Sequence, residues 1–302
     1  MKKNKNNKKM IVIVGPTASG KTGLSIKLAK VFGGEIISAD SRQVYKQMDI
    51  GTAKASKKEM AGIPHHLLDV ASPKKKFTVA QYRKLGIKAL NAIFKKNKLP
   101  IVCGGTGFYV QALIDGIVMP EVKPDWKLRK DLEQKTVEEL YQMIKKLDPR
   151  RAGNIDKKNP RRLIRAIEIS ITTKKPIPTI KMNPLPYPVL LLGAQKDPEK
   201  LKKDIEKRFY LWLKQGLLNE IKNLYKSGLS WKRIEEFGMH YRAFALYLQG
   251  KITREEAEKR SLKELWQYTK RQTTWFKRDQ RIIWVKNYAE AKKLAKNFLA
   301  EY

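Results

Sequence analysis

Residues 11–22 read IVIVGPTASGKT, a short β-branched run that leads into a glycine-rich loop and then into a helical pattern. The loop matches G-x-x-x-x-G-K-[ST], and a preceding strand with a following helix is the context in which that pattern binds phosphate. Backbone N–H groups of such a loop surround phosphate oxygens, and the helix N-terminus adds partial positive charge. The stretch predicts a P-loop; an ordinary glycine-rich turn is the alternative.

The alternation of strand and helix continues through the first 120 residues. Strand-like runs at 11–14, 35–38 and 100–103 are separated by helical patterns at 22–32 and 77–94. Buried strands joined by helices are typical of a parallel sheet with helices on both faces. We therefore expect an α/β fold whose P-loop sheet is flanked by helices.

The pattern changes after this segment. Residues 121–188 contain charged helical stretches and end in the proline-rich loop 174–188, which predicts a helical insertion subdomain. The apolar run 189–194 restores one strand, and the chain is then mainly helical and basic to residue 302. We expect three segments: 1–120 as the first part of the core, 121–188 as the insertion, and 189–302 as the return to the core plus basic C-terminal helices.

Charge and cysteine content limit the partners and the compartment. Lysine and arginine total 65 against 29 acidic residues, a formal net charge of +36, which favours an extended polyanion such as nucleic acid. A general compositional bias toward lysine is the alternative. The single Cys103 excludes an intramolecular disulfide, and no apolar run is long enough for a signal peptide or a membrane span. We expect a cytoplasmic protein that does not enter membranes.

The P-loop supplies the predicted anion site. Lys21 would neutralise a terminal phosphate, and the Thr22 hydroxyl is a candidate Mg²⁺ ligand. The motif by itself predicts binding of a diphosphate or a triphosphate and does not choose between them. The predicted diphosphate-binding residues are Gly15, Thr17, Ala18, Ser19, Gly20, Lys21 and Thr22.

Two further loops follow strand-like runs. Asp40, followed by Ser41, Arg42 and Gln43, comes after 35–38 and falls at the carboxyl edge of a parallel sheet, where such folds bind ligands. A helix N-cap is the alternative role for Asp40. The third loop, after residue 103, places the hydroxyl of Thr106 at the same edge.

A histidine pair precedes another aspartate. His65 and His66 are adjacent on a strand-like run, so their side chains point to opposite faces and a structural role is favoured over metal binding. Asp69, which follows them, is the best sequence candidate for a second Mg²⁺ partner.

Two basic helical stretches suit phosphate contacts. Arg161, Arg162 and Arg165 lie at the start of the pattern after Asn159, close together on a helix surface, with a solvated charged face as the alternative. Two neighbouring stripes run along the helical stretch 265–278. One contains Gln267, Arg271, Trp275 and Arg278, and the other contains Leu265 or Trp266, Thr269, Gln272 and Phe276. One face can pack against the core while the other contacts nucleic acid.

Together these residues resemble the tRNA dimethylallyltransferase family, also called tRNA isopentenyltransferases. The matching segments occur in the family's order and span nearly the whole chain: GPTASGKT (15–22), DSRQVYKQMDIGTAK (40–54), HHLLD (65–69), GGTGFY (104–109), NPRRLIRAIEI (159–169) and KRQTTWFKR (270–278). Residues 238–242 (GMHYR) differ from the family's pattern, so the resemblance implies no RNA contacts there.

The resemblance implies an activity. It is the transfer of a dimethylallyl group from dimethylallyl diphosphate to N6 of adenosine 37, beside the anticodon, in tRNAs reading codons that begin with U. Asp40 would be the general base and Thr106 would assist near the reacting amine or diphosphate, with Mg²⁺ as cofactor. The insertion would bind the tRNA anticodon stem-loop, and we expect a monomer. The implied tRNA-binding residues are Asp40, Ser41, Arg42, Gln43, Thr106, Arg161, Arg162, Leu163, Ile164, Arg165, Arg271, Gln272 and Arg278.

Two other functions compete with this one. A P-loop kinase acting on a nucleoside or small metabolite would fit the first 120 residues, but it would not explain the charge, the insertion or the stretch 270–276. A non-catalytic RNA-binding protein would not need Asp40 beside a complete P-loop. These three functions can be separated by incubating the protein and tRNA with labelled dimethylallyl diphosphate or with labelled ATP. Label that enters RNA only from the prenyl donor indicates the transferase.

Overall fold

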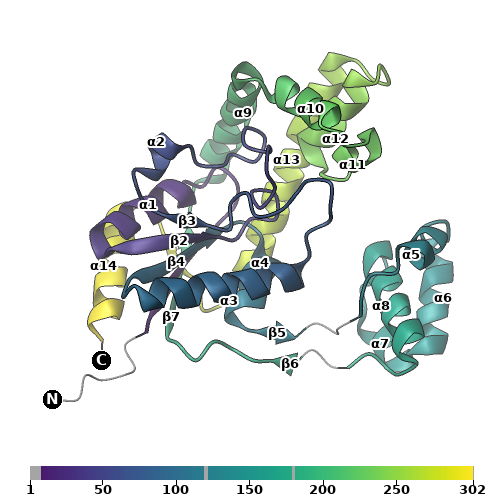
Figure 1. Ribbon diagram of the computed structural model, residues 1–302, viewed down its shortest axis with the longest axis horizontal. Coiled ribbons are helices and arrows are strands. Elements are labelled where there is room, and N and C mark those ends of the chain that lie inside the picture. Colours follow the sequence, from purple (N-terminus) through teal and green to yellow (C-terminus); the bar gives the residue numbers. More distant parts are fainter. Residues whose placement is uncertain (1–7, 119–121, 179–180, 302) are drawn as a thin grey trace. The chain divides into compact units, whose positions relative to one another are not determined.

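The computed structural model describes residues 8–118, 122–178 and 181–301. Its centre is a six-stranded sheet in the order β3-β2-β4-β1-β7-β8, in which every pairing is parallel (Figure 1). The α/β fold expected from the sequence is confirmed. The strands are β1 (Met10–Val14), β2 (Gly34–Ser38), β3 (His65–His66), β4 (Leu99–Gly104), β7 (Val189–Ala194) and β8 (Ile283–Val285).

Both faces of the sheet are covered by helices. Successive side chains of a strand point to opposite faces, so Ile11 and Ile13 of β1 pack under α1 and α14, whereas Met10, Val12 and Val14 pack into the larger core on the other face. All five residues are 0% exposed. This continuous burial explains why the strand reads as an uninterrupted apolar run.

The helices around this sheet belong to two groups. The first group flanks the strands: α1 (Lys21–Phe32), α2 (Lys57–Met60), α3 (Val79–Lys95), α4 (Gly107–Ile114) and α14 (Tyr288–Ala300). The second group follows β7: α9 (Pro198–Gln215), α10 (Leu217–Lys226), α11 (Trp231–Glu235), α12 (Met239–Leu248) and α13 (Arg254–Lys277). In the ranges that the structure describes, no helix combines the length and apolar character needed to cross a membrane.

Helix α13 carries one side of the site. Its buried stripe, Leu265, Thr269, Gln272 and Phe276, is the stripe that the sequence spacing predicted. Gln267, Arg271 and Arg278 are exposed, and Trp275 is half-buried. The long helix therefore packs one face against the core and leaves a basic face to solvent.

One short strand was not evident from the sequence. β8 lies in a segment expected to be mainly helical. A strand of three residues carries no measurable alternation of polar and apolar residues, so only its pairing with β7 identifies it. β3 falls on the strand-like run at His65 and His66 and has only these two residues.

Residues 117–183 form a second compact unit, separate from the unit of residues 1–116 and 184–302. It contains α5 (Trp126–Leu132), α6 (Val137–Leu147), α7 (Pro149–Asn154) and α8 (Pro160–Thr173), around a core that includes Leu140, Ile144, Leu163 and Ile167. The antiparallel pair β5 (Ile117–Val118) and β6 (Lys181–Met182) closes it. The sequence placed the insertion at 121–188; the unit begins and ends earlier because β5 and β6 belong to it.

Candidate active site

Three loops meet at the carboxyl edge of the sheet because the strands before them are neighbours. The P-loop follows β1, Asp40 follows β2, and Thr106 follows β4, which lies between β1 and β2. Backbone hydrogen bonds join the last two loops, from Ala39 N–H to the Cys103 carbonyl at 2.8 Å and from Thr106 N–H to the Ala39 carbonyl at 3.1 Å. The loops predicted separately from the sequence thus form one cluster.

The P-loop has the conformation of an anion cradle. Gly15 and Gly20 have φ of 152° and 87°, in the region that favours glycine, and no side chain caps the N-terminus of α1. The buried Ser19 Oγ has no hydrogen-bond partner in the part of the chain that the structure describes. Unsatisfied donors at a helix N-terminus favour a phosphate group.

Lys21 lies inside this cradle. Its Nζ donates to the Pro16 carbonyl at 3.2 Å, and burial lowers the pKa of its amino group, against the opposing effects of Cys103 and Asp40. A buried ammonium group is stabilised when an anion arrives beside it. Lys21 can therefore neutralise a bound diphosphate.

The site also fits Mg²⁺ in the form of a metal–diphosphate complex. Thr22 is in the first turn of α1, next to the cradle. Among the described residues, no group of three or more His, Cys, Asp or Glu could hold a metal ion by itself. Mg²⁺ usually keeps several waters and takes substrate phosphate oxygens, so one hydroxyl is a sufficient protein contribution.

The two carboxylate oxygens of Asp40 have different surroundings. Its Oδ1 accepts hydrogen bonds from the N–H groups of Arg42 at 2.8 Å and Gln43 at 3.3 Å, so it caps the turn that follows. The described chain offers no hydrogen bond to Oδ2. The capping alternative is therefore correct for one oxygen, while the other is left to accept a proton.

Thr106 is held beside Asp40's loop. Its Oγ1 accepts from Ser41 N–H at 3.0 Å and donates to Ser41 Oγ at 3.3 Å. The phenol of Tyr268 lies next to it, and burial raises the pKa of Tyr268 to about 12, with the charge of Asp40 acting in the same direction. Tyr268 therefore stays protonated and presents a hydroxyl group, not a charge, to the site.

Gln272 corrects the sequence expectation. Its side chain is 5% exposed; Nε2 donates to the Gly105 carbonyl and Oε1 accepts from Thr17 N–H, both at 2.9 Å. Both polar atoms of this side chain are bound within the protein, so the structure does not support the tRNA contact that the resemblance implied for Gln272. Gln272 instead ties the P-loop to the loop that carries Thr106.

Three residues expected at the tRNA are structural. Leu163 and Ile164 are 0% and 7% exposed and belong to the core of the second unit. Arg165 binds the fully buried Glu168 and donates to the Val122 carbonyl at 3.0 Å, because a carboxylate buried this deeply needs charged donors. Of the predicted arginines in this helix, Arg161 and Arg162 are exposed.

The second magnesium partner expected from the sequence is wrong. Asp69 follows β3, which is an edge strand separated from β1 by β2 and β4, and it pairs with Lys54 at 2.7 Å. The histidines before it also have protein partners: His66 Nε2 lies 2.7 Å from Glu35 Oε2, and His65 Nδ1 lies 2.8 Å from the Ile63 carbonyl.

Arg208 is a site residue that the sequence did not reveal. It lies on α9, burial lowers the pKa of its guanidinium, and its charge contributes to lowering the pKa of Lys21. In the described ranges it forms no ion pair. A second, half-buried cation whose charge acts on Lys21 makes Arg208 a candidate for diphosphate binding. Its sequence neighbourhood, KRFY, gave no signal because only the packing of α9 brings its charge within range of Lys21.

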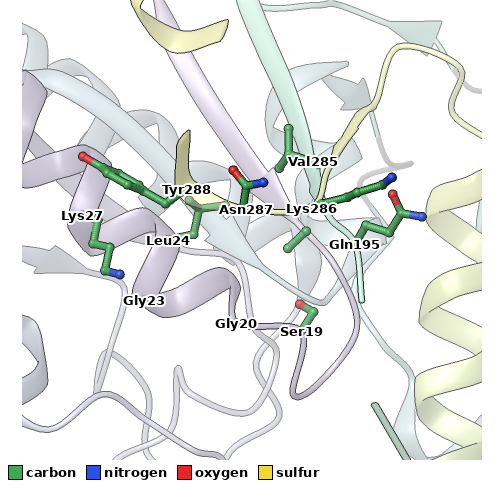
Figure 2. A pocket seen from close by; sticks show the side chains of 11 residues that line it. Ser19, Gly20, Gly23, Leu24, Lys27, Gln195, Val285, Lys286, Asn287 and Tyr288 are labelled. Atoms are coloured by element: carbon green, nitrogen blue, oxygen red, sulfur yellow. The ribbon is translucent and has the colours of Figure 1, made fainter. Parts of the chain in front are cut away.

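A pocket of about 230 Å³ borders the other side of the P-loop. It lies between the loop at Ser19 and Gly20 and the segment from Val285 to Tyr288, with Gln195 and Lys27 also lining it (Figure 2). Asp40, Thr106 and Gln272 do not line it. The P-loop is thus bordered by this pocket on one side and by the catalytic candidates on the other.

A parallel sheet with a complete P-loop, a carboxylate on the neighbouring loop and a helical insertion defines a P-loop α/β protein that acts on a phosphorylated substrate. The sequence model of the family described as IPP transferase matches residues 43–279. The chain belongs to this family.

Individual relatives agree with that assignment. The chain is 42% identical over 284 residues to a tRNA dimethylallyltransferase of Acetivibrio thermocellus, with 91% of each sequence covered, and 39% identical to that of Halothermothrix orenii, with 99% and 97% covered. It resembles the full-length tRNA isopentenylpyrophosphate transferase of Bacillus halodurans (34% identity, TM-score 0.73, 97% of each chain). It also resembles a eukaryotic dimethylallyltransferase acting on tRNA (29% identity, TM-score 0.74, 96% of this chain and 77% of that one).

Proposed function

We propose that this protein transfers the dimethylallyl group of dimethylallyl diphosphate to N6 of adenosine 37 in tRNAs that read codons beginning with U, releasing diphosphate. The observation that carries the proposal is the cluster at the sheet edge. A diphosphate cradle with the buried cation Lys21 and a carboxylate, Asp40, with one oxygen free of protein hydrogen bonds lie on neighbouring loops. The names of the relatives supply the prenyl group and tRNA, whereas the N6 atom, position 37 and the codon class are what the family resemblance implies.

The chemistry needs both halves of this cluster. The N6 lone pair is delocalised into the adenine ring, so attack on the allylic carbon makes the amine proton acidic and a base must take it. A new N–C bond forms as the C–O bond to diphosphate breaks, and the N6 proton passes to Asp40 Oδ2.

The negative charge of the departing diphosphate is stabilised by Lys21 and the P-loop N–H groups. Arg208, whose charge acts on Lys21, would add to this positive charge. Mg²⁺, when bound with Thr22, would neutralise further charge on the leaving group. Thr106, whose hydroxyl oxygen accepts from Ser41 N–H, follows β4, the strand between the one that leads to the P-loop and the one that leads to Asp40.

The basic face supports tRNA as the acceptor. Arg271 and Arg278 on α13, and Arg161 and Arg162 on α8, are exposed and available for phosphate contacts. Arg271 and Arg278 belong to the unit that contains the sheet, and Arg161 and Arg162 belong to the helical unit of residues 117–183. The helical unit of residues 117–183 is the part of the chain that we assign to the anticodon stem-loop.

Labelled substrates test the proposal. Purified protein is incubated with bulk tRNA and either dimethylallyl diphosphate labelled in the allyl group or ATP labelled in the γ-phosphate. We expect label in RNA only from the prenyl donor, on N6 of one adenosine after nucleoside digestion. Label transferred from ATP to any acceptor would instead support a kinase, and binding of tRNA without transfer from either donor would support an RNA-binding protein.

A further inference from the structure

Glu220, on α10, is a buried carboxylate outside the reacting groups. It is 9% exposed and accepts four hydrogen bonds. Oε2 accepts from the N–H groups of Asp49 and Ile50, both at 2.7 Å, and Oε1 accepts from Gly51 N–H at 3.2 Å and from the Tyr241 hydroxyl at 2.7 Å. Three consecutive backbone amides therefore turn toward one side chain.

Two buried aromatic residues pack against Gly51 of this loop. His240 and Tyr241, from α12, are each 1% exposed. A Cβ atom at Gly51 would lie 2.6 Å from His240 Nε2 and 2.7 Å from the Tyr241 hydroxyl, so this position admits only glycine without movement. Segment 49–51 is thus held by its N–H groups on the Glu220 carboxylate, and its last residue, Gly51, also packs against two buried rings.

The next residues of the same loop are hydrogen-bonded to the turn that follows Asp40. The carbonyls of Thr52 and Ala53 accept from Gln43 Nε2 at 3.1 and 3.2 Å, and Gln43 Oε1 accepts from Ser38 Oγ at 3.0 Å. The backbone N–H of Gln43 donates to Asp40 Oδ1. A continuous path of hydrogen bonds and short chain segments therefore links Glu220 to Asp40.

We propose that Glu220 is a positioning residue for the base Asp40. By fixing the amides of residues 49–51 it sets the carbonyls of Thr52 and Ala53, which hold the Gln43 side chain and so the turn that orients Asp40. Glu220 itself touches no substrate. The inference rests on the proposed function, because the role of Asp40 as base is part of that function.

The first test is Glu220→Gln, which keeps the size of the side chain but points amide hydrogens at backbone N–H groups. We expect kcat per folded molecule to fall about 10–100-fold, as for a small displacement of a catalytic group. The KM for dimethylallyl diphosphate should change less than about threefold, because no P-loop residue lies on the path. Hydrogen exchange of the amides of residues 49–51 should become faster.

A matched control separates this effect from lost stability. Glu35, 5% exposed, is a buried carboxylate on β2, hydrogen-bonded to His66 and Lys96 near the start of the strand and away from the carboxyl edge. Glu35→Gln should lower the melting temperature while leaving kcat per folded molecule unchanged. Equal losses of kcat in the two variants would overturn the proposal.

Gly51→Ala perturbs the same contact by placing a Cβ atom against His240 and Tyr241. This variant serves if Glu220→Gln does not fold. It should show the same fall in kcat with unchanged KM for the donor; unchanged kcat would overturn the proposal.

In a double-mutant cycle, Glu220→Gln and Gln43→Ala should lower kcat less than additively, and additive losses would refute the path through Gln43. A wild-type chain that transfers no label refutes the proposed function, whereas an active wild type with an unchanged Glu220→Gln variant refutes the positioning role alone.

Discussion

The side chain of Gln272 accepts a hydrogen bond from the backbone N–H of Thr17 at 2.9 Å, across 255 positions of sequence. The same amide donates to the Gly105 carbonyl. Helix α13 therefore ties the P-loop to the loop that carries Thr106. Gln272 lies in a basic stretch of sequence, but its side chain holds two loops of the site together.

Replacing Gln272 should weaken the protein without changing its salt response. Gln272→Leu leaves Thr17 N–H and the Gly105 carbonyl without partners, which costs about 1–3 kcal/mol of unfolding free energy. The slope of log tRNA affinity against log salt should stay unchanged. Urea unfolding and salt titrations check both, with the exposed Gln267→Leu as control. A variant with normal stability but altered discrimination between adenine and guanine at the target position would show instead that Gln272 contacts tRNA, as the resemblance implied.

Asp40→Asn distinguishes the two roles of Asp40. The amide keeps an oxygen that can cap the turn, but it cannot take a proton at neutral pH. We expect turnover to fall about 10²–10⁴-fold with tRNA affinity nearly unchanged. Turnover is measured with both substrates saturating, and Asp40→Ala removes the cap as well. Near-normal turnover in Asp40→Asn would leave Asp40 as a turn cap only.

Lys21→Ala and Thr22→Ala should affect the donor and not the tRNA. Both variants should raise the KM for dimethylallyl diphosphate, and Thr22→Ala should also raise the Mg²⁺ concentration needed for half-maximal rate. Filter binding with tRNA alone is the second measurement. An equal loss of tRNA affinity would indicate either global unfolding or direct contact between the P-loop and RNA.

The arginines divide into two sets by their contacts. Replacing exposed Arg161, Arg162, Arg271 or Arg278 by Ala should make the salt dependence of tRNA affinity shallower by something under about one unit each. The controls are Lys57→Ala and Lys292→Ala, which should change this salt dependence less. Slopes that do not differ between arginines and controls would show that the charge acts as a diffuse field.

Arg165→Ala should behave differently. Its guanidinium serves the buried Glu168, so its loss should lower stability by about 1–3 kcal/mol and leave the salt slope unchanged. Unfolding of the chain followed by circular dichroism reports the stability. A shallower slope with unchanged stability would return Arg165 to the RNA-contacting set.

His240 should make the protein less stable in mild acid. Burial lowers the pKa of His240 to about 3, from an ordinary value of 6.5. The unfolded chain binds a proton below pH 6.5 and the folded chain does not, so stability is complete above that pH and falls as the pH decreases toward 3. The loss is about 2 kcal/mol at pH 5 relative to pH 8.

His240→Phe isolates this contribution, since phenylalanine has no titrating ring. Urea unfolding at pH 8 and pH 5 should show that the loss of stability on acidification is smaller in the variant by about the same amount. Parallel pH profiles for variant and wild type would contradict a buried neutral histidine.

The sequence by itself determined the fold class and the donor half of the site. Local signals are sufficient there, because GPTASGKT between β1 and α1 fixes its own backbone, and the buried strands β1, β2, β4 and β7 are long enough to be recognised. It also placed Asp40 and Thr106 at one edge, since neighbouring parallel strands end on the same side.

Tertiary structure decided which side chains are free to act. Gln272, Leu163, Ile164 and Arg165 lie in motifs shared with the family, yet packing places the first between two loops and the others in or against the core of the helical unit. Arg208 and Glu220 carried no local signal, because their roles depend on atoms that approach from distant parts of the chain. Spacing along the sequence gives the face of a helix, but only the packed chain shows which polar groups on that face are already satisfied.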